Sequence, residues 1–109
     1  PRACQCGFCR RHGARTVTDP DGAATLVLGS GAHFYRFATR SADYVLCGRC
    51  GVNLGATAVI FGGLYATLNL NAFDDPSLDL QAVPVSYDGE TSQARAPRRR
   101  RAWTPARLA

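Results

Sequence analysis

The sequence contains no lysine and no methionine, although its formal net charge is +5. All 13 of its basic residues are arginine. The missing methionine bears on the extent of the chain, because the sequence begins at Pro1 without an initiator residue. We therefore expect this chain to be a fragment of a longer protein that has lost an N-terminal segment.

The sequence also lacks the run of about 18 apolar residues that a membrane-spanning helix requires. Its N-terminus carries arginine but no apolar segment of the kind found in secretory signals. The five cysteines are an odd number, which argues against a closed disulfide framework. We therefore expect a cytoplasmic protein with reduced thiols and no membrane partner.

Basic charge is concentrated at the C-terminal end of the chain. Residues 1–90 carry seven arginines and eight acidic residues, whereas residues 91–109 carry six arginines and no acidic residue. We expect a β domain over residues 1–90 and a basic, arginine-rich tail over residues 91–109. Because the run Arg98 to Arg101 has no interleaved aromatic residues, it is more typical of a solvated helix face near a C-terminus than of a nucleic-acid-binding surface.

Short apolar stretches separated by glycine and proline turns predict β-strands. Aromatic and polar residues alternate over residues 33–38, as in a half-buried strand. The predicted strands are residues 23–28, 33–38, 43–46, 57–61 and 64–73, with an edge strand at 83–85. We expect the first two to form a hairpin, and residues 91–102 can form a short helix. The sequence thus predicts a mainly β fold with a short C-terminal helix.

The five cysteines form two clusters, a triad of Cys4, Cys6 and Cys9 and a pair of Cys47 and Cys50. Thiolates are soft ligands, and several of them close in sequence can converge on one Zn²⁺. Three protein ligands with a fourth position open to water or substrate are the arrangement of catalytic zinc. The spacing is equally compatible with a closed structural site that combines the two clusters. The pair offers only two ligands, so it needs two more from the triad or from a histidine.

Two histidines and three arginines are further candidates for the site. His12 follows the triad by three residues and could bind the metal or move a proton. A surface position in a basic turn is the interpretation we favour for His12, and His33 is expected to be a packed or solvent-facing residue. Arg10, Arg11 and Arg15 could attract an anionic substrate or offset the negative charge of the thiolates.

Four stretches of the sequence are distinctive together. They are a Cys-x-Cys-x-x-Cys triad with Arg-Arg-His-Gly-Ala over residues 4–14, Tyr-Arg-Phe at 35–37, Leu-Cys-Gly-Arg-Cys-Gly-Val at 46–52 and Leu-Asn-Leu-Asn at 68–71. In these stretches the chain resembles the glutathione-dependent formaldehyde-activating enzyme family, which includes centromere protein V. The resemblance covers most of residues 3–75. It implies a zinc-bearing, mainly β fold of the Mss4-like (β-tent) type.

The resemblance also implies an activity and a set of metal ligands. Members are grouped as carbon–sulfur lyases, and the named reaction joins formaldehyde to glutathione as S-hydroxymethylglutathione. By position, Cys4, Cys6 and Cys9 match the catalytic-zinc triad, while Cys47 and Cys50 match half of a structural zinc site. The family's other half, an upstream Cys-x-Cys-Gly segment, is absent from this sequence. We therefore expect two zinc sites in an intact protein and an incomplete second site in this chain.

Three functions remain open at this point. The leading expectation is a zinc-dependent, carbon–sulfur lyase-like enzyme acting on a thiol–aldehyde adduct or a related small organosulfur substrate, with glutathione as one candidate thiol. In that enzyme Cys4, Cys6 and Cys9 would hold the zinc, and His12 or a water molecule would move the proton. One alternative is a non-catalytic zinc module whose basic tail binds nucleic acid or another acidic partner. Another is a redox or metal-handling protein that uses exposed thiolates.

Overall fold

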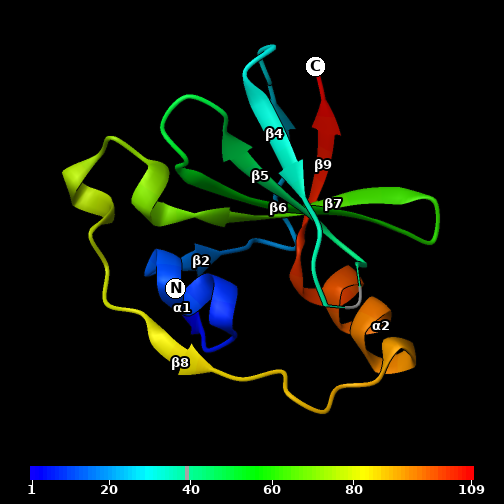
Figure 1. Ribbon diagram of the computed structural model, residues 1–109. Helices are drawn as coiled ribbons and strands as arrows, with labels where there is room; N and C mark the ends of the chain where they lie inside the picture. Colours follow the sequence, from blue (N-terminus) through cyan, green and yellow to red (C-terminus); the bar gives the residue numbers. More distant parts are fainter. Residues whose placement is uncertain (39) are drawn as a thin grey trace.

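The computed structural model describes residues 1–38 and 40–109 and shows a mainly β protein with two short α-helices (Figure 1). The strands are β1 (Arg2–Cys4), β2 (Thr16–Val17), β3 (Ala24–Leu26), β4 (Ala32–Tyr35), β5 (Asp43–Cys47), β6 (Asn53–Ile60), β7 (Gly63–Asn69), β8 (Val83–Val85) and β9 (Thr104–Leu108). The helices are α1 (Gly7–His12) and α2 (Ser92–Ala102), with two 3₁₀ helices, η1 (Leu70–Ala72) and η2 (Pro76–Leu78). The mainly β fold and the short C-terminal helix predicted from the sequence are both confirmed.

All nine strands are connected through one mixed sheet network. The main path has the order β4-β5-β6-β7-β2-β1-β8. Its centre is the antiparallel pair β6 and β7, in register from Gly55 opposite Leu68 to Ile60 opposite Gly63. Two strands share the other edge of β7, because β2 pairs with its last residues and β9 with its middle. The N-terminal and C-terminal segments of the chain are therefore both joined to β7.

The predicted hairpin between residues 23–28 and 33–38 is wrong. β3 pairs in parallel with β9, while β4 pairs in antiparallel orientation with β5. The partner of β3 comes from the far end of the chain, and a local turn pattern carries no information about such a pairing. The predicted strand over residues 64–73 also ends early, at Asn69. The Asn69 side chain accepts the Asn71 backbone N–H at 3.2 Å, which starts the 3₁₀ helix η1 instead.

The arginine-rich segment after residue 90 packs on the sheet. Thr91 caps α2 by accepting the Ala94 N–H at 3.1 Å, a typical N-cap interaction. After the helix, Trp103 is 6% exposed and joins a small buried cluster with Ala42, Ala56, Ala58 and Ile60. β9 then pairs with both β7 and β3. In Figure 1, α2 accordingly lies below and to the right of the point where β6, β7 and β9 cross.

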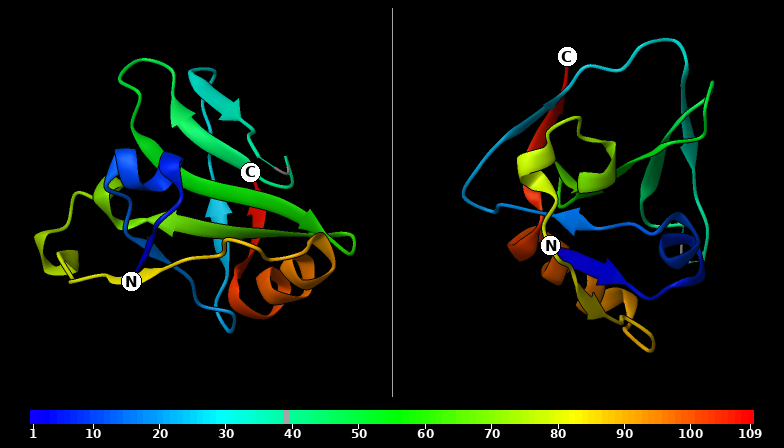
Figure 2. Two further views of the ribbon diagram at one scale, coloured as in Figure 1. Left: turned by 60° about the horizontal axis from the view of Figure 1, so that its bottom comes forward. Right: turned by 90° about the vertical axis from the view of Figure 1, so that its left-hand side faces the viewer.

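The helix α1 follows β1 at the end of the β1–β8 pair where Cys4 lies opposite Val85. β1 and β8 run side by side in parallel, from Arg2 opposite Val83 to Cys4 opposite Val85 (Figure 2). The chain then turns directly from β1 into α1. Within the described residues, no helix is long and apolar enough to cross a membrane.

Candidate metal centre

The three cysteines of the triad converge where β1 meets α1. Cys4 is the last residue of β1, Cys6 is the N-cap of α1, and Cys9 lies in the first turn of that helix. Their three Sγ atoms all lie within 4.8 Å of one another. Cys9 is the most enclosed, with 4% of its surface exposed. The predicted convergence of these three residues is therefore what the structure shows.

Short-range hydrogen bonds hold the triad in this shape. The Cys9 backbone N–H donates to Cys6 Sγ at 3.3 Å, so the sulfur acts as the helix cap. α1 ends after six residues because Gly13 adopts a left-handed conformation, with φ of 57°. The next residue, Ala14, donates its N–H to the Cys9 carbonyl at 3.0 Å. The chain thus bends tightly enough to bring all three sulfurs to one side.

The triad holds one sulfur as a thiolate near neutral pH. The pKa of Cys4 is lowered to about 5, mainly because the Cys9 thiol donates a hydrogen bond to it and also because the Cys6 backbone does. Conversely, this hydrogen bond to Cys4 and its own burial raise the pKa of the Cys9 thiol. Thiolate is the form in which cysteine binds metal ions, so the triad is prepared for a metal.

The donor set fits zinc. Zinc binds thiolates at about 2.3 Å in a tetrahedron, which places pairs of sulfur ligands roughly 3.8 Å apart. The triad sulfurs lie within 4.8 Å of one another, so closing on the ion requires movements of about one ångström. An all-sulfur set of this kind selects soft or borderline ions over magnesium or calcium. Three ligands leave one tetrahedral position for another group.

Two adjoining cavities reach the triad sulfurs. Cys4 and Cys6 line the larger one, of about 160 Å³, and Cys4 and Cys9 line a smaller one of about 60 Å³. The two cavities share five lining residues, which are Cys4, Tyr44, Tyr87, Arg98 and Arg99. Burial raises the pKa of the Tyr44 phenol above its ordinary value, so this hydroxyl stays protonated. A small molecule in this space would contact sulfur, phenol and guanidinium groups together.

The arginines at the larger cavity come from α2, which the sequence did not connect with the triad. They are Arg95, Arg98 and Arg99. Arg98 forms two hydrogen bonds to the Glu90 carboxylate, at 2.6 and 2.9 Å, and Arg95 lies 3.3 Å from the same carboxylate. This ion-pair group is largely buried, with side-chain exposures between 12 and 21%. The segment that looked like a solvated basic helix therefore forms one wall of the site.

Phe8 explains how α1 is fixed against the sheet. Its ring lies 5.6 Å from Tyr35, 5.0 Å from Phe37 and 4.7 Å from Tyr44, measured between ring centroids. Offset aromatic pairs at such distances add stabilisation beyond the apolar area that they bury. The triad-bearing helix is thereby attached to β4, β5 and the segment after β4. The alternating aromatics predicted as a strand face were the only sequence signal for this contact.

His12 points to this aromatic cluster. Its ring centroid lies 4.4 Å from that of Phe8, its side chain is exposed, and it lines neither cavity at the triad. His12 is also outside the group of converging metal ligands. Its role in proton transfer stays a prediction.

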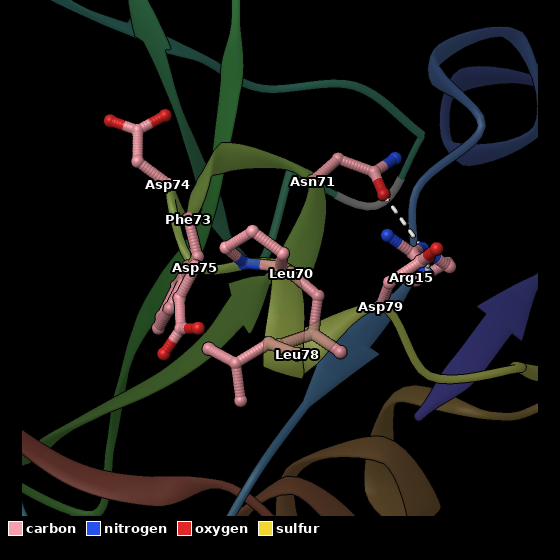
Figure 3. A pocket seen from close by; sticks show the side chains of 9 residues that line it. Arg15, Leu70, Asn71, Phe73, Asp74, Asp75, Leu78 and Asp79 are labelled. Atoms are coloured by element: carbon pink, nitrogen blue, oxygen red, sulfur yellow. Dashed lines mark hydrogen bonds and ion pairs between the residues drawn. The ribbon is translucent and has the colours of Figure 1, made fainter.

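The arginines predicted beside the triad take other positions. Arg15 forms a 2.7 Å ion pair with Asp79 and a 2.7 Å hydrogen bond to Asn71 (Figure 3). These residues border a separate, open hollow of about 390 Å³ next to η1 and η2, which Asp74 and Asp75 also line. Arg10 and Arg11 are exposed on α1. The arginines that line the two triad cavities are therefore those of α2 and, at the smaller cavity, Arg2 of β1.

Cys47 and Cys50 form a separate knuckle at the end of β5. Among the described residues they do not join the triad sulfurs, so the structure does not show the combined four-thiolate site. Backbone hydrogen bonds from Cys50 and Arg49 lower the pKa of the Cys47 thiol. Gly51, with φ of 79°, allows the tight turn and donates its N–H to the Cys47 carbonyl at 2.8 Å. Cys47 and Cys50 could supply two ligands to a metal, and their role as half of a structural site stays a prediction.

Replacing Gly48 with alanine should loosen this knuckle. A Cβ at this position would lie 2.6 Å from both His33 Nε2 and the Gly31 carbonyl oxygen. The Gly48 N–H also donates to that carbonyl at 2.7 Å, so the backbone has little room to move. We expect Gly48→Ala to lower the free energy of unfolding by about 1–3 kcal/mol, as overpacking does elsewhere. Urea denaturation would measure this, and Gly29→Ala is a matched control because a methyl group there would have no described atom within 4 Å.

Comparisons with known proteins connect the chain with one solved structure. No family model matches the chain. No curated protein matches it either. A crystal structure of a Rhodobacter sphaeroides protein, solved by structural genomics, is similar with a TM-score of 0.51 and 26% sequence identity. The match covers 76% of this chain and 77% of the other. It supports the fold and carries no activity over to this chain.

Proposed function

We propose that this protein is a zinc-dependent, carbon–sulfur lyase-like enzyme that makes or cleaves a thiol–aldehyde adduct. The observation that carries the proposal is the convergence of three cysteine sulfurs beside a cavity, with no fourth ligand among the described residues. A structural zinc site normally has four protein ligands, whereas a catalytic site keeps one position for water or substrate. The sequence resemblance to the formaldehyde-activating family supports the same activity.

The proposed reaction adds a thiol to an aldehyde carbonyl. The sulfur forms a bond to the carbonyl carbon, and the proton of the thiol ends on the carbonyl oxygen, so no oxidant or reductant is needed. Cys4, Cys6 and Cys9 would hold the zinc, which would supply Lewis-acid chemistry that favours the thiolate form of the substrate or polarises the carbonyl. The protonated Tyr44 hydroxyl is the group that can donate a hydrogen bond to the carbonyl oxygen as that oxygen gains negative charge. His12 or a water molecule would complete the proton transfer.

The state of the cysteines agrees with a reducing setting. None of the five cysteines, all of which the structure describes, forms a disulfide. Because thiolates rather than disulfides are needed at the triad, we propose a cytoplasmic location for the protein.

Nucleic-acid binding by α2 is the weaker proposal. Arg95, Arg98 and Arg99 are half-buried at the cavity, which leaves Arg100 and Arg101 as the exposed members of the run. Phosphate contacts by two arginines supply little of the electrostatic affinity on which sequence-independent binding depends. The placement of α2 thus favours a role at the triad cavity.

The proposed function is tested by adduct formation with zinc-loaded protein. Formaldehyde would be mixed with a panel of thiols that includes glutathione, and loss of free thiol would be followed with and without the protein. We expect acceleration with at least one thiol and its loss after zinc is removed by a chelator. Apo protein reloaded with zinc should regain the activity, which controls for unfolding. If no thiol reacts faster with the zinc-loaded protein, the proposed function is wrong.

A further inference from the structure

One arginine at the triad cavity, Arg99, has no carboxylate partner among the described residues. Arg95 and Arg98 share the Glu90 carboxylate. Arg99 forms no ion pair with a carboxylate in the part of the chain that the structure describes; its Nη1 donates to the Ser41 carbonyl at 3.4 Å and to the Ser41 hydroxyl at 2.8 Å. Asp88 also lines the cavity, but it is exposed and pairs with none of these arginines.

Two guanidinium nitrogens of the arginines at the cavity are buried and have no hydrogen-bond acceptor among residues 1–38 and 40–109. They are Arg99 Nε and Arg95 Nη1. Buried polar groups of native proteins are nearly always paired, with protein, water or a ligand. Burial lowers the pKa of the Arg99 guanidinium, because it disfavours the charged form. An anionic group in the cavity would compensate the Arg99 charge.

The size of the cavity limits what can enter. Its volume is about 160 Å³. Sites for drug-sized ligands range from about 300 to 1,000 Å³. The space therefore suits a ligand of few heavy atoms better than a tripeptide.

We infer that Arg99 selects a small mercaptocarboxylic acid, whose thiol reaches the triad while its carboxylate pairs with the Arg99 guanidinium. This inference rests on the proposed function for the role of the thiol. Arginine binds carboxylates through two parallel N–H donors, and such charge-assisted hydrogen bonds are stronger than neutral ones. A molecule whose carboxylate lies two or three bonds from its sulfur could contact both groups, because Cys4, Cys6 and Arg99 all line the same cavity.

The test compares two thiols of nearly equal size, 3-mercaptopropionate and its neutral amide. Their affinities for the zinc-loaded protein would be measured by isothermal titration calorimetry, which does not depend on turnover. We expect the acid to bind about 10- to 100-fold more tightly than the amide, as for a hydrogen bond to a charged group. In Arg99→Gln this preference should disappear while the affinity for the amide stays unchanged. Arg101→Gln, an exposed arginine on the same helix, should retain the preference.

Three results would overturn the inference. The wild-type protein could bind acid and amide equally, or Arg99→Gln could keep the preference. Arg99→Gln could also lower the affinity for zinc and weaken the binding of both thiols to the same extent. That result would show that Arg99 only balances the thiolate charge of the triad. Failure of the proposed function is a separate outcome, since binding preference for the acid without adduct formation would leave Arg99 as an anion-binding residue of a non-catalytic site.

Discussion

Substitution of Cys9 by serine should remove the metal from the triad and lower adduct formation by at least about 100-fold. Cys9 is the buried member of the triad, so no solvent molecule can easily take the place of its sulfur. A serine hydroxyl remains protonated at neutral pH and is a poor ligand for zinc compared with a thiolate. Mutation of a residue that only hydrogen-bonds to a metal ligand typically costs about 10- to 100-fold in metal affinity or activity. Loss of the ligand itself should cost at least as much. Zinc content and turnover of the purified variant measure the two effects.

Cys50→Ser is the matched control for this substitution. It makes the same chemical change in the exposed knuckle and leaves the three triad sulfurs in place. We expect Cys50→Ser to retain triad zinc and turnover. A Cys9→Ser protein with unchanged zinc content and activity would contradict a catalytic role for the triad. Because metal binding adds to folding free energy, the melting temperature of Cys9→Ser should also fall when zinc is present.

Glu90→Gln should destabilise the protein by about 3 kcal/mol at neutral pH. Glu90 is the shared counterion of Arg95 and Arg98, and all three side chains are largely buried. Removing one partner of a buried ion pair costs about 3–5 kcal/mol because charge is left uncompensated, and the partial exposure here favours the lower end. The substitution should weaken the packing of α2 against the sheet. Because Arg95 and Arg98 of α2 also line the larger triad cavity, the shape of that cavity should change as well. Denaturation with guanidinium chloride measures the change in the free energy of unfolding.

The effect of Glu90→Gln should depend on pH. The hydrogen bonds from Arg98 hold the pKa of Glu90 below its ordinary value of 4.5. A group with a lowered folded-state pKa contributes its full stability above the unfolded-state pKa and loses it as pH falls through the folded-state value. Wild-type and variant stabilities should therefore differ most above pH 4.5 and approach each other below it. Asp88→Asn, which changes an exposed carboxylate nearby, should show little difference at either pH, and equal losses in both variants would rule out a special role for Glu90.

The candidate site was predictable where its residues are close in sequence. Three cysteines within six residues can gather around one point with little chain to order, and the structure brings them together as expected. The alternating aromatics of residues 33–38 indicated a strand, and β4 covers the first half of that stretch, up to Tyr35. The second cluster is equally local, because Gly51 donates its backbone N–H to the Cys47 carbonyl and closes the turn between the two cysteines.

The other half of the site depends on contacts that local patterns do not contain. Arg99 and Cys4 line the same cavity although they lie near opposite ends of the chain, because β9 draws α2 back to β7. The same long-range pairing gives β3 its partner, which is why the predicted hairpin failed. Charge composition suggested a solvated helix, but burial against the sheet decides which arginines meet the cavity. Tertiary packing, rather than helix or strand preference, placed these residues.

The coordination of zinc in a double variant, Cys47→Ser with Cys50→Ser, decides whether the triad is an open metal site by itself. In that protein only the triad can hold the metal through cysteine sulfur. We expect one zinc per chain, and X-ray absorption should show three sulfur ligands and one oxygen or nitrogen ligand, because the triad leaves one tetrahedral position open. Loss of zinc binding in this variant would contradict an open triad site, since it would mean that the two clusters share a single closed site.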